Sequence, residues 1–274
     1  MNPSDSWWPL AEGFRSDLFV AGASIGEWRD RYAFADVELE EGAWLAECDR
    51  SLLASAERGV DLVTPHGELL ARKSGGGEQI EASEGSFFLN YPWDLLEVNE
   101  QVVGALLEDK IEGNVNAAAQ IVGKVEIGVG TKILPGVFIE GNAVIGRDCK
   151  IGPNCYIRGN TAIGDGVHIG QSVEVKNSII GNGTAVGHLS YVGDSILGRD
   201  VNFGAGTIIA NFRHDGRTHR SLVDGSLVDT KREKFGAIVG DGVHTGIHTA
   251  IYPGRKLGPG VSTRPNETVQ SDLC

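Results

Sequence analysis

Cysteine is scarce in this chain of 274 residues, and its four copies, Cys48, Cys149, Cys155 and Cys274, form no Cys-x-x-Cys pair. This spacing argues against a zinc knuckle or a dithiol redox motif. The chain also lacks a run of about 18 apolar residues, which a membrane-spanning helix needs. Its N-terminus has no basic segment followed by an apolar one, as a secretion signal would. We therefore expect a soluble, cytoplasmic protein with free thiols and no metal site.

Positive charge is in deficit, because the formal net charge is −13. Nucleic-acid binding depends on neutralising phosphates, and anionic membranes attract basic segments, so we expect neither partner. Ten basic residues nevertheless fall between Arg199 and Arg264. Such a local basic zone suits a small molecule that carries phosphate, although a solvated face balanced by neighbouring carboxylates is equally compatible with the pattern.

The strongest pattern is an aliphatic residue at every sixth position from Val115 to Val175, with glycine following many of them. A helix cannot use this period, because the apolar residues would drift around its axis. Short strands that end in tight corners can use it. The pattern predicts an all-β fold, a parallel β-helix built from hexapeptides.

The period continues with two shortened steps, at Ile180 and Leu197, and stops at Asn211 before it resumes at Val239. Residues 211–236 are therefore predicted to be an inserted loop, polar and basic. Long insertions of this kind are usually functional or disordered, and in a solenoid they tend to lie on the binding face.

Composition divides the chain near residues 90–114, because all five tryptophans lie in the first third of the chain and 28 of the 39 glycines follow residue 110. We expect a small β-rich module over residues 1–90, a helix over 91–110 and the β-helix over 111–274. The helix carries an apolar stripe that includes Leu95, Val98 and Val102. We expect it to link the two parts and to cap the open first turn of the solenoid.

The second half of the chain contains three sequence motifs that are specific enough to compare with a known family. They are VEVK ending at Lys176, GHLSYVGD from Gly187 to Asp194, and VNFGAGT from Val201 to Thr207. They resemble the acetyltransferase half of the bifunctional glucosamine-1-phosphate N-acetyltransferase/N-acetylglucosamine-1-phosphate uridylyltransferase family, archaeal-type branch. The resemblance is closest over residues 155–211 and looser over 92–270. It implies a left-handed β-helix, a homotrimer, and transfer of acetyl from acetyl-CoA to the amine of an amino-sugar 1-phosphate.

His188 matches the family's catalytic base. The assignment suits the chemistry, because the substrate ammonium must lose a proton before it attacks a thioester, and histidine titrates near neutral pH. Taken alone, His188 is better interpreted as an exposed residue at a corner of the coil, because it is one of seven histidines in the chain. Its place inside the matched string favours the catalytic role.

Other family positions carry over to the sugar-phosphate ligands Arg158 and Lys176 and to the sugar-contacting Tyr191 and Asn202, with Glu174 beside them. Arg158 and Lys176 are three hexapeptides apart, so we expect them to stack on one face roughly 5 Å apart. Two stacked cations repel each other unless an anion lies between them, so the pair indicates an anionic ligand. Alternatively, Arg158 and Lys176 are surface residues whose charges are balanced by neighbouring carboxylates.

On the acetyl-donor side, Asn211 matches an asparagine near the acetyl group, but several expected residues are missing. Phe212 stands where the family has a tyrosine, Ile247 where bacterial relatives have a serine, and the C-terminal arginine tail is absent. We therefore expect Arg255 and Lys256, or the basic insertion, to hold the phosphates of CoA.

The family's uridylyltransferase half has no recognisable counterpart, since residues 1–110 are about half as long and lack its nucleotide signature. The string YPWDLLEVNE resembles the linker between the two halves. Two alternatives to acetyl transfer stay open. One is a non-catalytic, nucleotidyltransferase-like trimeric scaffold. The other is a zinc enzyme of the γ-carbonic-anhydrase type, but the spacing of the available histidines, His168, His188, His244 and His248, does not match that signature.

Overall fold

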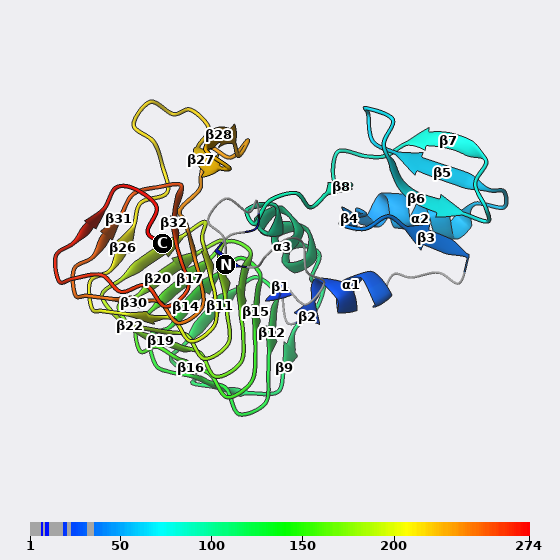
Figure 1. Ribbon diagram of the computed structural model, residues 1–274. Helices are drawn as coiled ribbons and strands as arrows, with labels where there is room; N and C mark the ends of the chain where they lie inside the picture. Colours follow the sequence, from blue (N-terminus) through cyan, green and yellow to red (C-terminus); the bar gives the residue numbers. More distant parts are fainter. Residues whose placement is uncertain (1–6, 8, 11–18, 21–22, 32–35) are drawn as a thin grey trace.

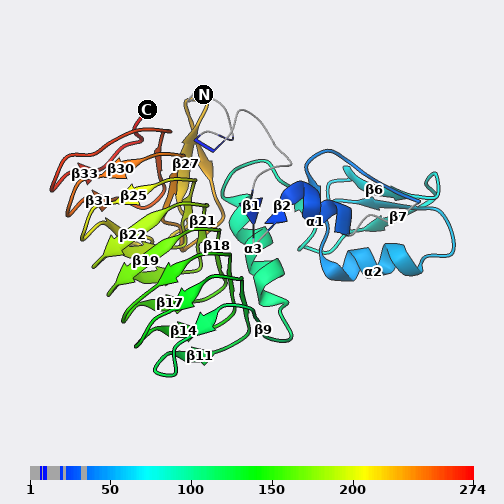
Figure 2. The ribbon, with the colours of Figure 1, turned by 90° about the horizontal axis from the view of Figure 1, so that it is seen from below.

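A computed structural model describes residues 7, 9–10, 19–20, 23–31 and 36–274. Figure 1 shows a coil of short strands, a smaller mixed sheet beside it, and a helix between the two. Figure 2 shows the turns of the coil stacked in sequence order, from the green first turn to the red last turn.

The coil is made of three parallel sheets, here called the first, second and third faces. The first face contains β10 (Asn114–Val115), β13 (Lys132–Ile133), β16 (Lys150–Ile151), β19 (His168–Gln171), β22 (Ala185–His188), β25 (Asn202–Phe203) and β30 (His244–Thr245). The second face contains β11 (Gln120–Val122), β14 (Phe138–Glu140), β17 (Tyr156–Arg158), β20 (Glu174–Lys176), β23 (Tyr191–Gly193), β26 (Ile208–Ile209), β31 (Ala250–Ile251) and β33 (Thr268–Val269). The third face contains β9 (Lys110–Ile111), β12 (Val125–Ile127), β15 (Ala143–Ile145), β18 (Thr161–Ile163), β21 (Ile179–Ile180), β24 (Ile196–Leu197), β29 (Ala237–Val239) and β32 (Arg255–Leu257).

The register follows the sequence period. Ile139 pairs with Ile157, 18 residues later, so one turn uses three hexapeptides. Where the period shortens, Ile163 pairs with Ile180, 17 residues later, and the turn closes without losing register. The repeating aliphatic side chains point inward and form one continuous buried core along the axis. The predicted parallel β-helix is confirmed.

The N-terminal part contains a four-stranded sheet in the order β3 (Val37–Leu39), β6 (Leu69–Lys73), β5 (Val60–Val63) and β7 (Glu78–Glu81), in which only β5 and β7 pair in parallel. The α2 helix (Glu47–Ser55) contributes Leu53 to a core of its own with Leu62 and Leu70. The remaining elements are the pairs β1 (Phe19–Val20) with β2 (Ala23–Ser24) and β4 (Ala43–Trp44) with β8 (Phe87–Phe88), and the helix α1 (Ile25–Arg31). The residues Asp17 and Leu18, which pattern alone assigns to a strand with Phe19, lie outside the described residues.

The helix α3 (Asp94–Gly104) lies along the side of the solenoid and does not cap its first turn. Its apolar residues Leu95, Leu96 and Val98 pack with outward-facing side chains of the third face, in a cluster that runs from Val144 to Ile238. Asn99 Nδ2 donates to the carbonyl oxygen of Asn160 (2.7 Å). The capping prediction is wrong because the third face presents an apolar outer surface that covers more of the helix than one open turn could.

The inserted segment forms an antiparallel hairpin of β27 (Arg220–Val223) and β28 (Ser226–Asp229). A bridge between Phe212 and Lys234 closes its base, and Phe235 is fully buried against Trp93 of the helix entry. The insertion is thus a folded element between the solenoid and α3. None of the described helices is long and apolar enough to cross a membrane.

Candidate functional site

Arg158 and Lys176 lie side by side at the carboxyl ends of β17 and β20, as their spacing predicts. Each has its own carboxylate. Arg158 Nε donates to Glu174 Oε1 (2.8 Å), and Lys176 Nζ donates to Asp194 Oδ2 (2.7 Å). Tyr156, Glu174 and Tyr191 stack in register at the starts of β17, β20 and β23. The second face therefore gathers four of the predicted sugar-phosphate ligands on adjacent turns.

Asp194 holds this group together, although no role was assigned to it from the sequence. The residue is only 2% exposed, and its carboxylate also accepts hydrogen bonds from the amides of Asn177 (3.1 Å) and Asn211 (2.5 Å). A buried carboxylate needs such donors, because an unpaired buried charge is strongly unfavourable. Its position in the GHLSYVGD string was the available signal.

Tyr191 and Asn211 meet over Gly193. The Asn211 amide donates to the Tyr191 hydroxyl oxygen (2.9 Å). A Cβ atom on Gly193 would lie 2.7 Å from that amide nitrogen, so glycine is needed for the two side chains to meet. Burial, followed by the nearby carboxylates of Asp194 and Glu174, raises the pKa of Tyr191, so its hydroxyl keeps its proton at neutral pH.

His188 ends β22, at the corner between the first and second faces, and its side chain is exposed. Its imidazole makes no hydrogen bond or ion pair with any described residue, whereas its carbonyl oxygen accepts a hydrogen bond from Ser190 Oγ (2.7 Å). The chain runs from this corner through β23 before it reaches Asp194, so His188 and the Lys176–Asp194 pair lie at opposite ends of one strand. Within one chain, His188 is not brought into contact with the sugar-phosphate ligands.

Asn202 lies on the first face, in register with Ala185 of the previous turn and with His244 of the next. Its side chain is exposed. It belongs to the same face as His188 and is separated by the corner from Tyr191, Lys176 and Arg158.

The predicted CoA-phosphate ligands Arg255 and Lys256 lie on the third face, in β32. Lys256 is only 1% exposed, and its ammonium group donates to the carbonyl oxygen of Leu222 in the hairpin. Burial lowers its pKa. The Lys256 prediction is corrected on this ground, because an ammonium covered by the hairpin cannot reach a phosphate in solvent. Arg255 is half-buried and its Nε donates to the Pro253 carbonyl oxygen (3.3 Å).

The network around Asp194 extends to α3 and to the insertion. Asn177 Nδ2 donates to Glu100 Oε1 (2.6 Å), and the Arg232 guanidinium donates to the same oxygen. Glu100 was missed because no pattern in the sequence relates a helix residue to a corner of the solenoid 77 residues later. Phe212, on the same insertion, has the Lys234 ammonium 3.4 Å above its ring.

Among the described residues, no three His, Cys, Asp or Glu side chains converge as a metal site requires. All four cysteines are free thiols. The histidines named for the zinc alternative therefore form no ligand set within this part of the chain.

The repeat, the three parallel faces and the continuous aliphatic axis define a hexapeptide-repeat β-helix. The family model of the GMPPB C-terminal domain matches residues 111–213 and 139–252, more than half of the chain. The chain therefore belongs to this family, and its solenoid is similar to the acetyltransferase-type hexapeptide domain of archaeal bifunctional sugar-1-phosphate nucleotidylyltransferases/acetyltransferases.

Two relatives illustrate the match. The bifunctional sugar-1-phosphate nucleotidylyltransferase/acetyltransferase of Sulfurisphaera tokodaii is 42% identical over 182 residues, covering 66% of this chain and 45% of the relative. The bifunctional protein GlmU of Methanococcus vannielii is 41% identical over 182 residues, covering 66% of this chain and 44% of the relative. The chain thus spans less than half the length of these relatives.

Solved structures with a similar fold include the UDP-N-acetylglucosamine O-acyltransferase LpxA of Moraxella catarrhalis. It is 15% identical, with a TM-score of 0.39, over 57% of this chain and 67% of that one.

Proposed function

We propose that this chain is an N-acetyltransferase that transfers acetyl from acetyl-CoA to the amine of an amino-sugar 1-phosphate. The observation that carries the proposal is the stacked pair of Arg158 and Lys176, of which Lys176 is joined through Asp194 and Asn211 to Tyr191. The names of the relatives, which pair a sugar-1-phosphate activity with an acetyltransferase, support the substrate class.

In this reaction the sugar phosphate binds between the Arg158 guanidinium and the Lys176 ammonium, and Tyr191, Asn202 and Glu174 contact sugar hydroxyls. His188 takes a proton from the sugar ammonium. The free amine attacks the thioester carbonyl, so a C–N bond forms, the C–S bond breaks and CoA leaves as the thiol. Asn211 lies near the acetyl group, and Arg255 is the remaining candidate for the CoA phosphates.

The substrate phosphate has to compete with Glu174 and Asp194 for the two cations. Arg158 and Glu174 are each about one-third exposed, so their ion pair is weak and easily exchanged for a phosphate. Lys176 keeps Asp194 as a buried partner and presents its remaining N–H donors to the ligand.

We further propose that the active form is a homotrimer whose sites lie between subunits. Four apolar side chains are exposed near the His188 corner and on the second face: Leu189, Ile208, Ile247 and Tyr252. Exposed apolar side chains that gather on one face usually mark an interface. A second copy against it would bury these side chains and complete the separated halves of the site, with His188 from one copy and Lys176 from another.

The test is a thiol-release assay with acetyl-CoA and a panel of amino-sugar 1-phosphates. Stoichiometric thiol release with one of them, and mass-spectrometric detection of its N-acetyl product, supports the proposal. The absence of thiol release across the panel contradicts it and favours a non-catalytic trimeric scaffold. Two observations favour this second function. Arg158 and Lys176 already have carboxylate partners, and Phe212 stands in place of a tyrosine.

A further inference from the structure

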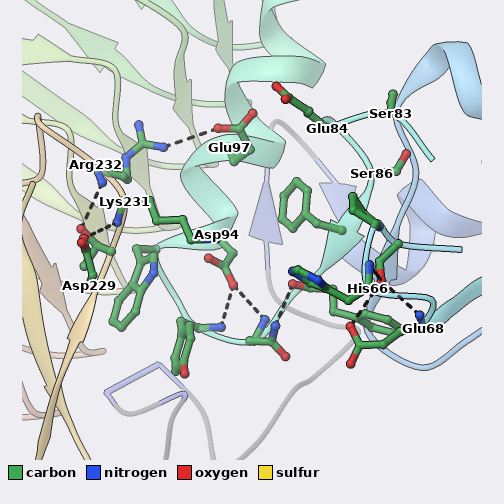
Figure 3. Close-up of a pocket in the computed structure, with 18 of the residues that line it drawn as sticks. His66, Glu68, Ser83, Glu84, Ser86, Asp94, Glu97, Asp229, Lys231 and Arg232 are labelled. Carbon is green, nitrogen blue, oxygen red and sulfur yellow. Dashed lines mark hydrogen bonds and ion pairs between the residues drawn. The ribbon is translucent and has the colours of Figure 1, made fainter. Parts of the chain in front are cut away.

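A cavity of about 640 Å³ lies between the N-terminal sheet, the start of α3 and the end of the inserted segment. Figure 3 shows labelled side chains from all three regions facing it, among them His66, Asp94 and Lys231. Its volume falls within the range of sites for small molecules, about 300–1,000 Å³.

The lining of this cavity is short of positive charge. Six of its described residues are carboxylates, and three are lysine or arginine: Glu68, Glu84, Asp94, Glu97, Asp229 and Glu233, against Lys231, Arg232 and Lys234. Two of the three basic residues already have partners. Arg232 pairs with Glu100 and with Glu97 of the cavity lining, and the Lys234 ammonium lies over the Phe212 ring. An anionic ligand would thus meet net negative charge.

Asp94 is the carboxylate best placed to need a cation. Its Oδ2 atom accepts hydrogen bonds from the backbone N–H groups of Asn90 and Tyr91, both at 2.8 Å, and these fix its orientation. Burial raises its pKa to about 6, which reflects the cost of a charged carboxylate at this depth. A positive group in the cavity would offset that cost.

The cavity also has an aromatic wall. Phe87, Phe88 and Tyr91 line it and are each partly exposed. The Tyr91 ring stacks on Trp93 with centroids 4.5 Å apart and an interplanar angle of 16°, so its orientation is fixed. Aromatic faces attract cations, and they also pack against flat or apolar groups.

We propose that this cavity binds a small organic cation, an ammonium or guanidinium group attached to a flat or apolar body. The cationic group lies against Asp94, and the body packs on Phe87, Phe88 and Tyr91. This proposal does not depend on acetyl transfer, although the cavity-lining Arg232 shares Glu100 with the Asn177–Asp194 network.

The experiment compares three probes that share one ring and differ in charge. Tryptamine is cationic, tryptophol is neutral and indole-3-acetate is anionic. Each is titrated calorimetrically into the full chain at pH 7.5, with uridine monophosphate as a phosphate-bearing probe. We expect tryptamine to bind at least tenfold more tightly than the other three.

Two variants should change the affinity for tryptamine in opposite directions. Asp94→Asn keeps an oxygen acceptor for the two backbone N–H groups and removes the charge, so tryptamine affinity should fall at least tenfold. Lys231→Glu removes a positive charge that lies near Asp94, so tryptamine affinity should rise. Glu108→Gln, an exposed carboxylate of the linker outside the cavity, should leave it unchanged.

Tighter binding of indole-3-acetate or uridine monophosphate, lost in Lys231→Glu, would overturn the proposal in favour of an anion site. Equal binding of all probes, or no binding up to millimolar concentration by a chain with an intact circular dichroism spectrum, would also overturn it.

Discussion

Lys176 and Asp194 form an ion pair across one turn of the solenoid, with the lysine Nζ 2.7 Å from the aspartate Oδ2 and the aspartate almost completely buried. Asp194 also anchors Asn177 and Asn211, so it positions side chains from the turn before it and the turn after it. The proposed sugar-phosphate site thus rests on a residue that need not touch the substrate.

Asp194→Asn should impair substrate binding more than chemistry. The amide keeps the shape of the carboxylate but no longer fixes the lysine, so the KM for the amino-sugar phosphate should rise by roughly tenfold or more with a smaller change in kcat. Steady-state kinetics with matched circular dichroism spectra provide the measurement. Asp241→Asn, in the exposed pair with Arg199, is the control and should leave both constants unchanged. An unaltered KM in Asp194→Asn would remove its positioning role.

His188→Ala should abolish acetyl transfer while leaving the fold intact. The side chain is exposed at a corner, so its truncation opens no core cavity and thermal stability should hardly change. Loss of a general base costs about 10²–10⁴-fold in rate. His214→Ala, on the exposed part of the insertion, is the matched control. Turnover near that of the wild type at every pH tested would refute the catalytic assignment.

Arg158→Ala should behave differently from His188→Ala. A phosphate contact distant from the reacting amine contributes similar binding in the ground and transition states, so KM should rise with little change in kcat. Loss of a charged hydrogen bond corresponds to roughly 10–100-fold. Arg147→Ala removes an exposed arginine from another corner and should have no effect. A fall in kcat at constant KM would contradict a phosphate-binding role.

The purified chain should be a trimer in light scattering at micromolar concentration, and Leu189→Glu should dissociate it. Leu189 is 62% exposed beside His188, and a charge there would be unfavourable in an apolar interface. Leu107→Glu changes an 89% exposed leucine of the linker and should leave the mass unchanged. A monomeric wild-type chain would exclude a site shared between subunits.

Asp94→Asn should stabilise the chain above pH 6. The folded-state pKa of about 6 lies above the unfolded value of 3.8, so this group contributes most stability below pH 3.8. The contribution is lost as the pH rises through 6, because the folded state then releases a proton that the unfolded state has already released. Each pKa unit corresponds to about 1.4 kcal/mol, so the effect is at most about 3 kcal/mol.

The charged groups that face Asp94 are Lys231 and Arg232 of the insertion, Glu97 of its own helix, and His66 and Glu68 of the N-terminal part. Melting temperatures of the wild type and Asp94→Asn at pH 5 and pH 8 provide the measurement. We expect the variant to gain more at pH 8 than at pH 5. The reverse order would mean that Asp94 is stabilised as the carboxylate.

The solenoid could be predicted from the sequence because the same local pattern recurs in each hexapeptide. An inward aliphatic residue and a corner glycine recur, so the pairing of Ile139 with Ile157 follows from the period alone. The stacking of Arg158 on Lys176 follows for the same reason.

The parts that could not be predicted depend on contacts between unrelated segments. The apolar stripe of α3 shows that one side is buried but not what covers it, and the outer surface of the third face is what covers it. Lys256 reads as an exposed cation because outward positions of a solenoid are usually solvated, and only the hairpin above it makes it buried. The cavity around Asp94 is assembled from three such segments.

The most direct test of the central claim compares one amino sugar with and without its 1-phosphate, as acceptors of acetyl from acetyl-CoA in the thiol-release assay. The Arg158–Lys176 pair predicts a kcat/KM for the phosphorylated sugar higher by at least tenfold, and a loss of this preference in Arg158→Ala. Equal rates with both acceptors would contradict a sugar-phosphate site on the second face, and thiol release with neither would contradict acetyl transfer itself.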